Sequence, residues 1–283
     1  MQTIAIVGVG LIGGSFALAL RKAGFEGRIV GVSSPVTLEK AVARGAIDEG
    51  ASLKDAVSRA DLVYLAQPIV RILETIAVID PWLRPEALVT DAGSTKVRIA
   101  EYAQRFIRHA QFLGGHPMAG KESRGVESAD PDLFGGRTYM LTPSSGAELE
   151  TRAARTLLDW IRRIGARILS LPAEEHDRLV AFTSHLPQLA STALASLIGE
   201  HLRKPEDHLA GGPGLADTTR LALSSYEIWR DILATNNEAV RAALSAYIRR
   251  LEHIRDNLDE PEIERVFQSA AGFRRRLDRS SSD

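Results

Sequence analysis

The run TIAIVGVGLIGG at residues 3–14 is the strongest indication of the fold of this chain. Its apolar first half predicts a short buried strand, and the glycines that follow have the spacing GxGxxG, which opens a helix in dinucleotide-binding folds. Gly8 permits the tight turn, Gly10 lets the backbone approach a pyrophosphate, and Gly13 lets the helix pack closely on the strand. The free N–H groups at the start of that helix favour an anion. The run therefore predicts a nucleotide site, with a merely structural glycine turn as the alternative.

The choice between NAD and NADP depends on the residues at the end of the second strand. We predict that strand over residues 28–32, and an acidic residue just beyond it would bind the ribose 2′-hydroxyl of NAD. The chain has Ser33 and Ser34 there, which we take as cofactor contacts together with Leu11 and Ile12 of the glycine run. No acid repels a 2′-phosphate there and no arginine attracts one, so NAD and NADP both stay open.

Strands and helices alternate through residues 1–170. Strands that alternate with helices favour βαβ units and a parallel sheet covered on both faces. We therefore predict an α/β fold in which residues 1–170 form a Rossmann-type, doubly wound domain. The apolar pattern predicts strands at 4–7, 28–32, 62–66, 87–90, 112–114 and 139–141, and helices at 15–23, 38–44, 70–79 and 96–107.

The pattern changes after Pro172, where continuous helical periodicity begins. The only strong interruption is GGPG at residues 211–214. We predict an all-helical second domain over residues 171–283. Its helix 236–257 carries one apolar stripe, which must be buried either in the domain's own core or against a second subunit.

Composition excludes several classes of function. The net charge is -1, so nothing draws the chain generally to nucleic acid or an anionic membrane. No stretch reaches the roughly 20 apolar residues that span a bilayer. The chain has no cysteine, which excludes disulfides, thiolate nucleophiles and cysteine-ligated metals, and no HExxH motif suggests another metal. We expect a cytoplasmic protein without a signal peptide, a metal or a nucleic-acid partner.

The run GGHPMAG at residues 114–120 carries the most informative candidate for chemistry. It follows a predicted strand, so His116 should emerge at the carboxyl end of that strand, where doubly wound sheets bind their ligands. An imidazole with a pKa of about 6.5 can accept a hydroxyl proton at neutral pH. Oxidation of an alcohol needs that proton removed as hydride leaves the same carbon. His116 is therefore a candidate general base.

Several short motifs along the chain resemble the prephenate dehydrogenase family. The resemblance extends from the first strand to about residue 235, and motifs in a shared order are more specific than any one of them. They are VGVGLIGGS (7–15), DAGSTK (91–96), GGHPMAG (114–120), DLF (132–134), LTP (141–143), EHD (175–177), TSHLP (183–187), DTTR (217–220) and EIW (227–229).

That resemblance implies an NAD- or NADP-dependent dehydrogenase of tyrosine biosynthesis. Such an enzyme oxidises and decarboxylates prephenate to 4-hydroxyphenylpyruvate, or arogenate to tyrosine, and passes a hydride to the nicotinamide. The family also implies a helical domain that binds this small-molecule substrate and forms a homodimer. An arogenate-specific, NADP-dependent enzyme stays an alternative. Since the chain ends about where the family's catalytic part ends, we expect no C-terminal regulatory domain.

The resemblance also assigns roles to individual residues. His116 would accept the proton of the ring C4 hydroxyl, and Ser94 would hydrogen-bond that hydroxyl or the nicotinamide. His185 and Arg220 would bind the substrate, and the planar fork of an arginine suits a carboxylate. Glu122 would gate or tune the site.

Each assignment has a plainer alternative. In the alternative for Ser94, its side chain simply caps the helix that begins at residue 95 or 96. In the alternatives for the other two, His185 is a core histidine whose ring nitrogens are hydrogen-bonded within the protein, and Arg220 forms a surface or intersubunit ion pair. We expect Trp229 to pack against the pocket wall or the interface, and His176 to serve at a helix start or domain joint.

Two further functions compete with this interpretation. A β-hydroxyacid-type dehydrogenase would centre on a lysine of the helical half, where only Lys204 stands, next to a proline. A non-catalytic dinucleotide-binding regulator would keep the glycine run but would not need the histidines and the arginine. The favoured function requires His116 and Arg220 to face one cleft beside the nicotinamide.

Overall fold

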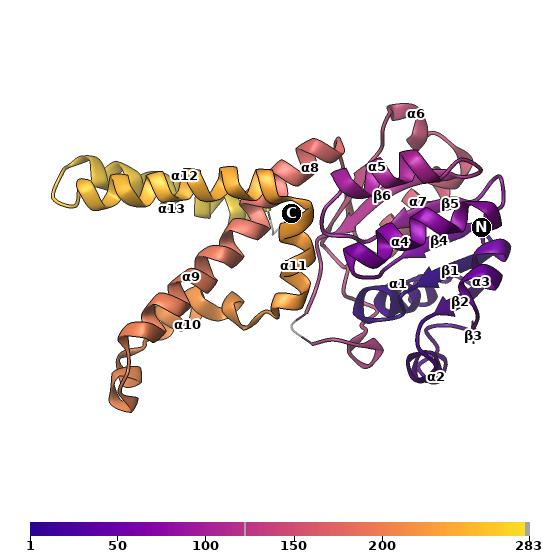
Figure 1. Cartoon of the computed structure of the whole chain (residues 1–283), viewed down its shortest axis with the longest axis horizontal. Helices are drawn as coiled ribbons and strands as arrows, with labels where there is room; N and C mark the ends of the chain where they lie inside the picture. The colour runs from indigo at the N-terminus through magenta and orange to yellow at the C-terminus, as the bar shows by residue number, and fades with distance from the viewer. Residues whose placement is uncertain (122, 281–283) are drawn as a thin grey trace. The chain divides into compact units, whose positions relative to one another are not determined.

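The computed structural model describes residues 1–121 and 123–280, so the predicted site residue Glu122 lies outside the described residues. The chain divides into one unit over Met1–Asn237 and a second that begins at Glu238. Both units are traced in Figure 1. All the other predicted site residues belong to the first unit.

Within the described residues, eight strands form one sheet in the order β3-β2-β1-β4-β5-β6-β7-β8. Neighbouring strands are parallel except for β6 and β7, which are antiparallel. The first six strands thus have the order of a Rossmann fold. The strands are β1 (Thr3–Val7), β2 (Arg28–Val32), β3 (Glu49–Gly50), β4 (Leu62–Leu65), β5 (Leu88–Asp91), β6 (Gln111–Pro117), β7 (Thr138–Thr142) and β8 (Arg167–Ser170).

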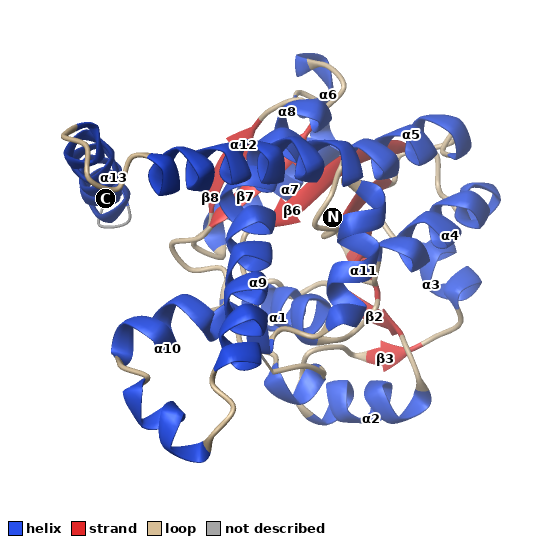
Figure 2. Ribbon diagram, turned by 60° about the vertical axis from the view of Figure 1, so that its left-hand side comes forward, coloured by secondary structure: helices blue, strands red, loops and turns tan. Residues whose placement is uncertain are grey.

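Helices cover both faces of this sheet (Figure 2). They are α1 (Leu11–Lys22), α2 (Pro35–Ala43), α3 (Leu53–Arg59), α4 (Ile69–Ile79), α5 (Val97–Phe106), α6 (Gly146–Leu149) and α7 (Arg152–Arg163). Ile4 and Ile6 of β1 belong to the buried cluster that α1 and α7 cover, whereas Ala5 and Val7 belong to the cluster under α3, α4 and α5. Since alternate residues of a strand point to opposite faces, both faces of β1 are buried, and each of its larger aliphatic side chains stabilises the fold by about 1.5–3 kcal/mol.

The predicted α/β class is confirmed, but some elements differ from the prediction. α1 begins at Leu11 and not at residue 15, because Gly13 serves close packing and does not break the helix. The sequence pattern did not predict β3, α3, α6, α7 and β8. Four of these have seven residues or fewer, and arginines interrupt the apolar residues of α7. The sheet is also not wholly parallel, because β7 returns beside β6 without a crossover helix.

The chain beyond β8 is helical, as predicted. α8 (Ala173–Val180) continues through a π-helical turn at Ala181–His185 into α9 (Leu186–His201). α10 (Pro213–Thr219) and α11 (Tyr226–Thr235) follow, with a short 3-10 turn at Arg220–Leu223 between them. The domain boundary predicted between residues 170 and 171 stays a prediction.

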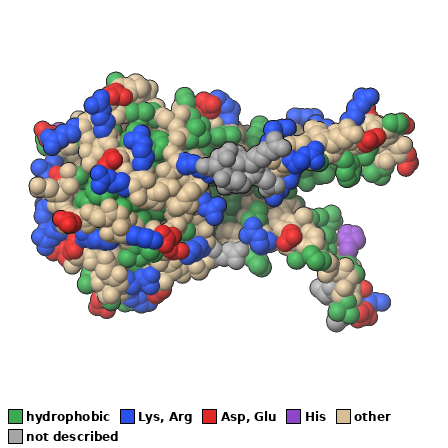
Figure 3. All heavy atoms as spheres, turned by 180° about the vertical axis from the view of Figure 1, so that it is seen from behind, with side chains coloured by type: hydrophobic (Ala, Val, Ile, Leu, Met, Phe, Trp, Pro, Cys, Tyr) green, Lys and Arg blue, Asp and Glu red, His purple; other side chains and the backbone are tan. Residues whose placement is uncertain are grey.

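The second unit consists mainly of two helices, α12 (Asn237–Asp256) and α13 (Glu262–Ser280). α12 agrees within a residue at each end with the helix predicted over 236–257. Hydrophobic side chains gather along one side of this unit in Figure 3. No described helix combines the length and apolar character that crossing a membrane requires. The large exposed apolar side chains of the unit are Tyr247, Ile248, Leu251, Leu258, Phe267, Phe273 and Leu277.

Candidate active site

The three glycines of the first loop have the distinct environments that their predicted roles require. Gly8 has φ 95°, and a Cβ there would lie 2.4 Å from the Ala66 carbonyl oxygen. A Cβ on Gly13 would lie 2.1 Å from the Gly8 carbonyl oxygen. At Gly10, by contrast, a Cβ would meet no atom within 4 Å. The loop is therefore closed where helix and strand pack and open where a phosphate would approach the start of α1.

The end of β2 presents two exposed serines. Gly8 donates its backbone N–H to the carbonyl oxygen of Val32, which ties the glycine loop to this strand at 2.9 Å. Ser34 caps α2, because its Oγ accepts a hydrogen bond from the Thr37 backbone N–H at 3.4 Å. Ser33 and Ser34 thus follow the strand end that holds the glycine loop, and they leave the coenzyme undecided.

Ser94 lies in a cleft at the carboxyl edge of the sheet. The cavity has a volume of about 320 Å³ and lies between α1, the segments that follow β4 and β5, the start of α4, and α11. The alternative role of Ser94 as a helix cap is wrong, because α5 begins at Val97 and the carboxylate of Asp177 accepts from the backbone N–H groups of Lys96 and Val97. The cavity is lined by Ile12, Ala66, Gln67, Pro68, Ile69, Ala92, Gly93, Ser94, Arg124, Glu227, Ile228, Asp231 and Ile232.

His116 belongs to a chain of hydrogen bonds that the sequence analysis did not predict. It lies near the carboxyl end of β6 and is 9% exposed. Its Nδ1 lies 2.9 Å from Nε2 of His176, and Nδ1 of His176 lies 2.8 Å from Oδ1 of Asp177. His176 is fully buried on α8. It therefore contacts the candidate base directly, whereas the sequence analysis gave it only a role at a helix start or domain joint.

The direction of these hydrogen bonds follows from the carboxylate. Asp177 can only accept when ionised, so His176 donates from Nδ1 and keeps a lone pair on Nε2. That lone pair accepts the Nδ1–H of His116, which leaves the lone pair of His116 on Nε2. Among the described residues, Nε2 of His116 has no hydrogen-bond partner. Asp177, His176 and His116 thus form a hydrogen-bonded relay, which leaves His116 able to accept a proton.

Burial keeps this acceptor neutral. Burial is the largest cause that lowers the pKa of His116 well below 6.5, and the neighbouring His176, the Lys96 cation and His185 lower it further. The pKa of His176 is also lowered, again mainly by burial, although the hydrogen bond to Asp177 opposes that shift. Both rings are therefore uncharged at neutral pH.

A buried ion pair lies directly beside this relay. Lys96 and Asp91 are both fully buried and form a short ion pair. Lys96 Nζ also donates to the carbonyl oxygen of Gly115 at 2.7 Å, and Asp91 accepts from the backbone N–H groups of Gly93 and Gly115. The pair fixes the ends of β5 and β6, and therefore the position of His116.

His185 is the last residue of the π-helical turn that connects α8 to α9. The π-helical turn at Ala181–His185 inserts an extra residue per turn, a feature that is frequent at functional sites. His185 is 1% exposed and meets the Trp229 ring edge to face, with 5.8 Å between ring centres. Burial is also the main reason that its pKa falls to about 4.

Arg220 lies in a second, basic cavity of about 720 Å³. Arg124 and Ile228 line both this cavity and the one that contains Ser94, so the two adjoin. Gln188, one turn after His185, also lines the basic cavity and donates to the carbonyl oxygen of Leu221 at 2.7 Å. The cavity is lined by Gly120, Lys121, Arg124, Gln188, Arg220, Leu221, Leu223, Ser224, Ser225 and Ile228.

Sequence reasoning missed His176, Asp177 and Lys96 as members of the site. Their signal was present in the runs DAGSTK and EHD, but nothing in a sequence places residues 96 and 177 together. Lys204, the lysine that a competing function would require, is exposed.

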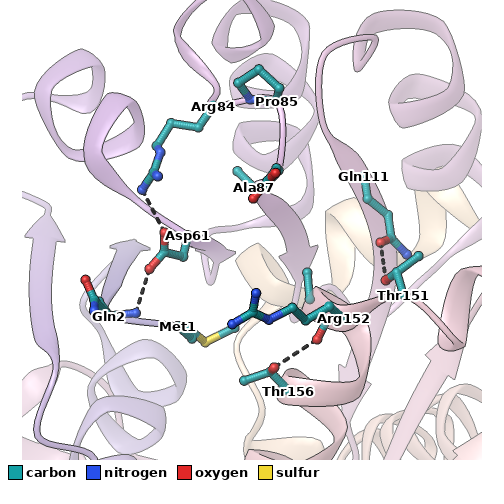
Figure 4. A pocket seen from close by; sticks show the side chains of 12 residues that line it. Met1, Gln2, Asp61, Arg84, Pro85, Ala87, Gln111, Thr151, Arg152 and Thr156 are labelled. Carbon is teal, nitrogen blue, oxygen red and sulfur yellow. Dashed lines mark hydrogen bonds and ion pairs between the residues drawn. The ribbon is translucent and has the colours of Figure 1, made fainter.

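Another cavity, of about 550 Å³, opens at the amino ends of the strands (Figure 4). There Asp61 accepts from the backbone N–H of Gln2 and from Arg84, and the side chain of Thr151 donates to Gln111. None of the predicted site residues lines it.

Two family models match consecutive parts of this chain. The family model of the prephenate dehydrogenase nucleotide-binding domain matches residues 16–170, and that of the prephenate dehydrogenase dimerization domain matches residues 172–271. The prephenate dehydrogenase of Bacillus subtilis is 35% identical, over 94% of this chain and 73% of that protein.

Solved structures give the same result. The prephenate dehydrogenase of Aquifex aeolicus in complex with hydroxyphenyl propionate and NAD+ superposes with a TM-score of 0.88 at 32% identity, covering 98% of both chains. The arogenate dehydrogenase of Synechocystis superposes with a TM-score of 0.82 at 32% identity, over 97% of this chain and 99% of the other.

Proposed function

Because the chain belongs to the prephenate dehydrogenase family, we propose that it oxidises and decarboxylates a cyclohexadienyl acid, prephenate or arogenate, with NAD or NADP as hydride acceptor. The observation that carries the proposal is the relay from Asp177 through His176, which leaves a lone pair on Nε2 of the buried His116. A neutral imidazole with that lone pair is the group that must accept the hydroxyl proton.

The glycine loop fits a dinucleotide. Gly10 leaves open space at the start of α1, and Gly8 and Gly13 have the geometry that brings backbone N–H groups to a pyrophosphate. Leu11 and Ile12 would contact the same ligand, with Ser33 and Ser34 near its adenosine ribose. The bound dinucleotide supplies the hydride acceptor.

His116 acts as the general base in this mechanism. Its Nε2 accepts the proton of the ring C4 hydroxyl as hydride leaves C4, and Ser94 hydrogen-bonds the hydroxyl or the nicotinamide. The cation that forms on His116 is stabilised through His176 by the carboxylate of Asp177. The oxidised ring then loses carbon dioxide and becomes aromatic, which drives the reaction forward.

The basic cavity is the proposed site for the carboxylates of the substrate. Arg220 lines it together with Lys121 and Arg124, and a guanidinium can bind both oxygens of a carboxylate. Arg124 is also paired with Glu227 at 3.1 Å, at the junction with the cavity of Ser94. His185 lies one helical turn from Gln188 of the same cavity and completes the set.

The two halves of the chain would divide these tasks. We assign nucleotide binding to residues 1–170, and substrate binding and dimerisation to residues 171–283, which the extents of the two family models support. The exposed apolar side chains of α12 and α13 support a homodimer, since a second copy would bury them. The proposed location is the cytoplasm, because a chain without cysteine gains nothing from an oxidising compartment.

One assay tests the function. The purified protein is incubated with prephenate or arogenate and with NAD or NADP, and the absorbance of the reduced nicotinamide is followed. Reduction with at least one of these pairs is expected, and the preferred pair identifies the substrate and the coenzyme. No reduction with any pair would contradict the proposal. Light scattering of Phe267→Glu against the unaltered protein tests the dimer, because a buried glutamate should dissociate it.

A further inference from the structure

Asn236 connects the two histidine systems of the site. It follows α11 directly and is 6% exposed. Its side-chain Nδ2 donates to the backbone carbonyl oxygen of Asp177 at 2.8 Å and lies 3.4 Å from Nδ1 of His185. One amide group therefore contacts both the residue that begins the His116 relay and the second histidine.

The orientation of this amide is fixed by Asp177. A carbonyl oxygen only accepts, so the group that faces it must be the NH₂ and not the oxygen of the Asn236 amide. The same NH₂ faces His185, and since it can only donate, Nδ1 of His185 must carry the lone pair. The proton of a neutral His185 then resides on Nε2.

We propose that Asn236 is a positioning residue that holds His185 in the Nε2–H form, so that this histidine is a neutral hydrogen-bond donor to an oxygen of the substrate. The inference rests on the proposed function only for the identity of that oxygen. His185 is then the opposite tautomer of His116, which keeps its lone pair on Nε2. Each buried histidine has its tautomer set by a different neighbour, and both neighbours meet at Asp177.

The pair of tautomers suits the chemistry of a cyclohexadienyl acid. The hydroxyl of the substrate donates its proton and needs an acceptor, which is Nε2 of His116. The other oxygens of the substrate need hydrogen-bond donors, and Nε2–H of His185 is one. A neutral His185 can donate a hydrogen bond to such an oxygen without adding a further positive charge to the three cations that line the basic cavity. The titratable groups near His185 are Asp177, His176 and His116, and the Trp229 ring meets it edge to face.

The direct test is the nitrogen-15 spectrum of the histidine rings in the unaltered protein, because the two neutral tautomers give different shifts at Nδ1 and Nε2. The His185 resonances are assigned by their loss in His185→Gln. We expect a neutral ring protonated on Nε2. A ring protonated on Nδ1 would overturn the inference, whether or not the protein turns over prephenate, so this failure is distinct from failure of the proposed function.

Two variants separate positioning from a purely structural role. Asn236→Asp presents an acceptor to Nδ1, so His185 should become protonated there, and the Michaelis constant for the substrate should rise at least about fivefold with a smaller change in kcat. Asn236→Ala should raise the Michaelis constant in the same way while the affinity for the coenzyme is kept. Unchanged His185 shifts in Asn236→Asp, or an unchanged Michaelis constant in both variants, would overturn the inference.

The chain offers a matched control in Asn257. Its Nδ2 donates to the His253 carbonyl oxygen at 2.8 Å and lies 3.5 Å from Nδ1 of His253, the same kind of contact on α12. Asn257→Ala should leave the His185 shifts and both kinetic constants unchanged. If it changed them as Asn236→Ala does, the effect would not be specific to the site and the inference would fail. The spectrum of the unaltered protein decides the tautomer even where an Asn236 variant does not fold.

Discussion

Nδ1 of His116 lies 2.9 Å from Nε2 of His176, and this contact joins the end of a strand in the nucleotide-binding half to a helix of the other half. The two residues are 60 positions apart in the sequence. Their hydrogen bond fixes which nitrogen of His116 can accept a proton, because His176 is itself oriented by Asp177. The reactivity of one histidine is therefore set by a carboxylate that it does not touch.

Asp177→Asn should remove most of the activity without touching the base. Oδ1 of Asp177 accepts from both the Lys96 backbone N–H and Nδ1 of His176, so the amide oxygen should take that position and the NH₂ should face the Val97 N–H. The variant therefore keeps the tautomers but loses the negative charge that stabilises the cation forming on His116. We expect kcat to fall about 10- to 100-fold, because a hydrogen bond to a charged group contributes about 1.5–3 kcal/mol. Steady-state kinetics check this. Asp159→Asn, an exposed carboxylate on α7, serves as the control and should keep its activity.

His116→Asn should abolish most turnover while coenzyme binding survives. Asparagine has no basic nitrogen, so the hydroxyl proton loses its acceptor, which costs about 10²- to 10⁴-fold in kcat. The glycine loop is not altered, so the dissociation constant of the coenzyme should change little. Kinetics and a coenzyme titration measure the two quantities. His201→Asn, an exposed histidine on α9, is the control. Normal turnover in His116→Asn would remove this residue from the mechanism.

The pH profile of kcat/KM should have its acid limb below pH 6.5. A base must be unprotonated to accept, and burial together with the nearby positive groups holds the pKa of His116 well below 6.5. The enzyme therefore keeps its base form at pH values where an ordinary histidine is half protonated, about 6.5. Initial rates at low substrate concentration across pH 5–8 would show an acid limb at or above 6.5 if this prediction were wrong.

The same shifts predict the direction of acid instability. Folding lowers the pKa of His116, His176 and His185, so below about pH 6.5 the unfolded chain binds more protons than the folded one. Their contribution to stability is complete above that pH and is lost as the pH falls. The melting temperature should therefore decline from pH 7 to pH 5, and activity is compared only where the protein stays folded.

Much of the fold could be predicted because one run carries several signals at once. Residues 3–14 combine a buried strand, a glycine turn and a helix start, and the alternation that follows gives the Rossmann order. The elements that were missed lack such signals. β3 has two residues, and β8 has three exposed ones among its four, so neither shows an apolar run.

The site was only partly predictable, for a different reason. His116, near the end of a strand, and Ser94, just after one, could be assigned from local pattern, but His176 contacts His116 only because α8 packs against β7 and α5. Its neighbours Glu175 and Asp177 made it look like a helix start. Nothing local shows that Asp177 caps a distant helix with its carboxylate, since that depends on tertiary packing.

Gly10→Ala and Gly13→Ala should separate coenzyme binding from folding. A Cβ on Gly13 would lie 2.1 Å from a carbonyl oxygen, so that variant should lose about 1–3 kcal/mol of stability or more. A Cβ on Gly10 meets no atom within 4 Å, so that variant should melt normally but bind the coenzyme more weakly. Thermal melting and a coenzyme titration of both variants test the contrast, and equal destabilisation would contradict it.

Arg220→Ala should act mainly on the Michaelis constant. Arg220 lines the basic cavity with Lys121 and Arg124, so its loss removes one of three cations that would hold the carboxylates of the substrate. A hydrogen bond between charged groups contributes about 1.5–3 kcal/mol, which corresponds to a rise of about 10- to 100-fold in the Michaelis constant. The base and its relay are untouched, so kcat should fall much less.

The matched control for this variant is Arg162→Ala, because Arg162 is exposed on α7, outside both cavities of the site. It should leave both constants unchanged. A normal Michaelis constant in Arg220→Ala would contradict the carboxylate role and would leave Lys121 and Arg124 as the cations of that cavity. An equal fall of kcat and kcat/KM would instead mean that Arg220 acts on the transition state alone.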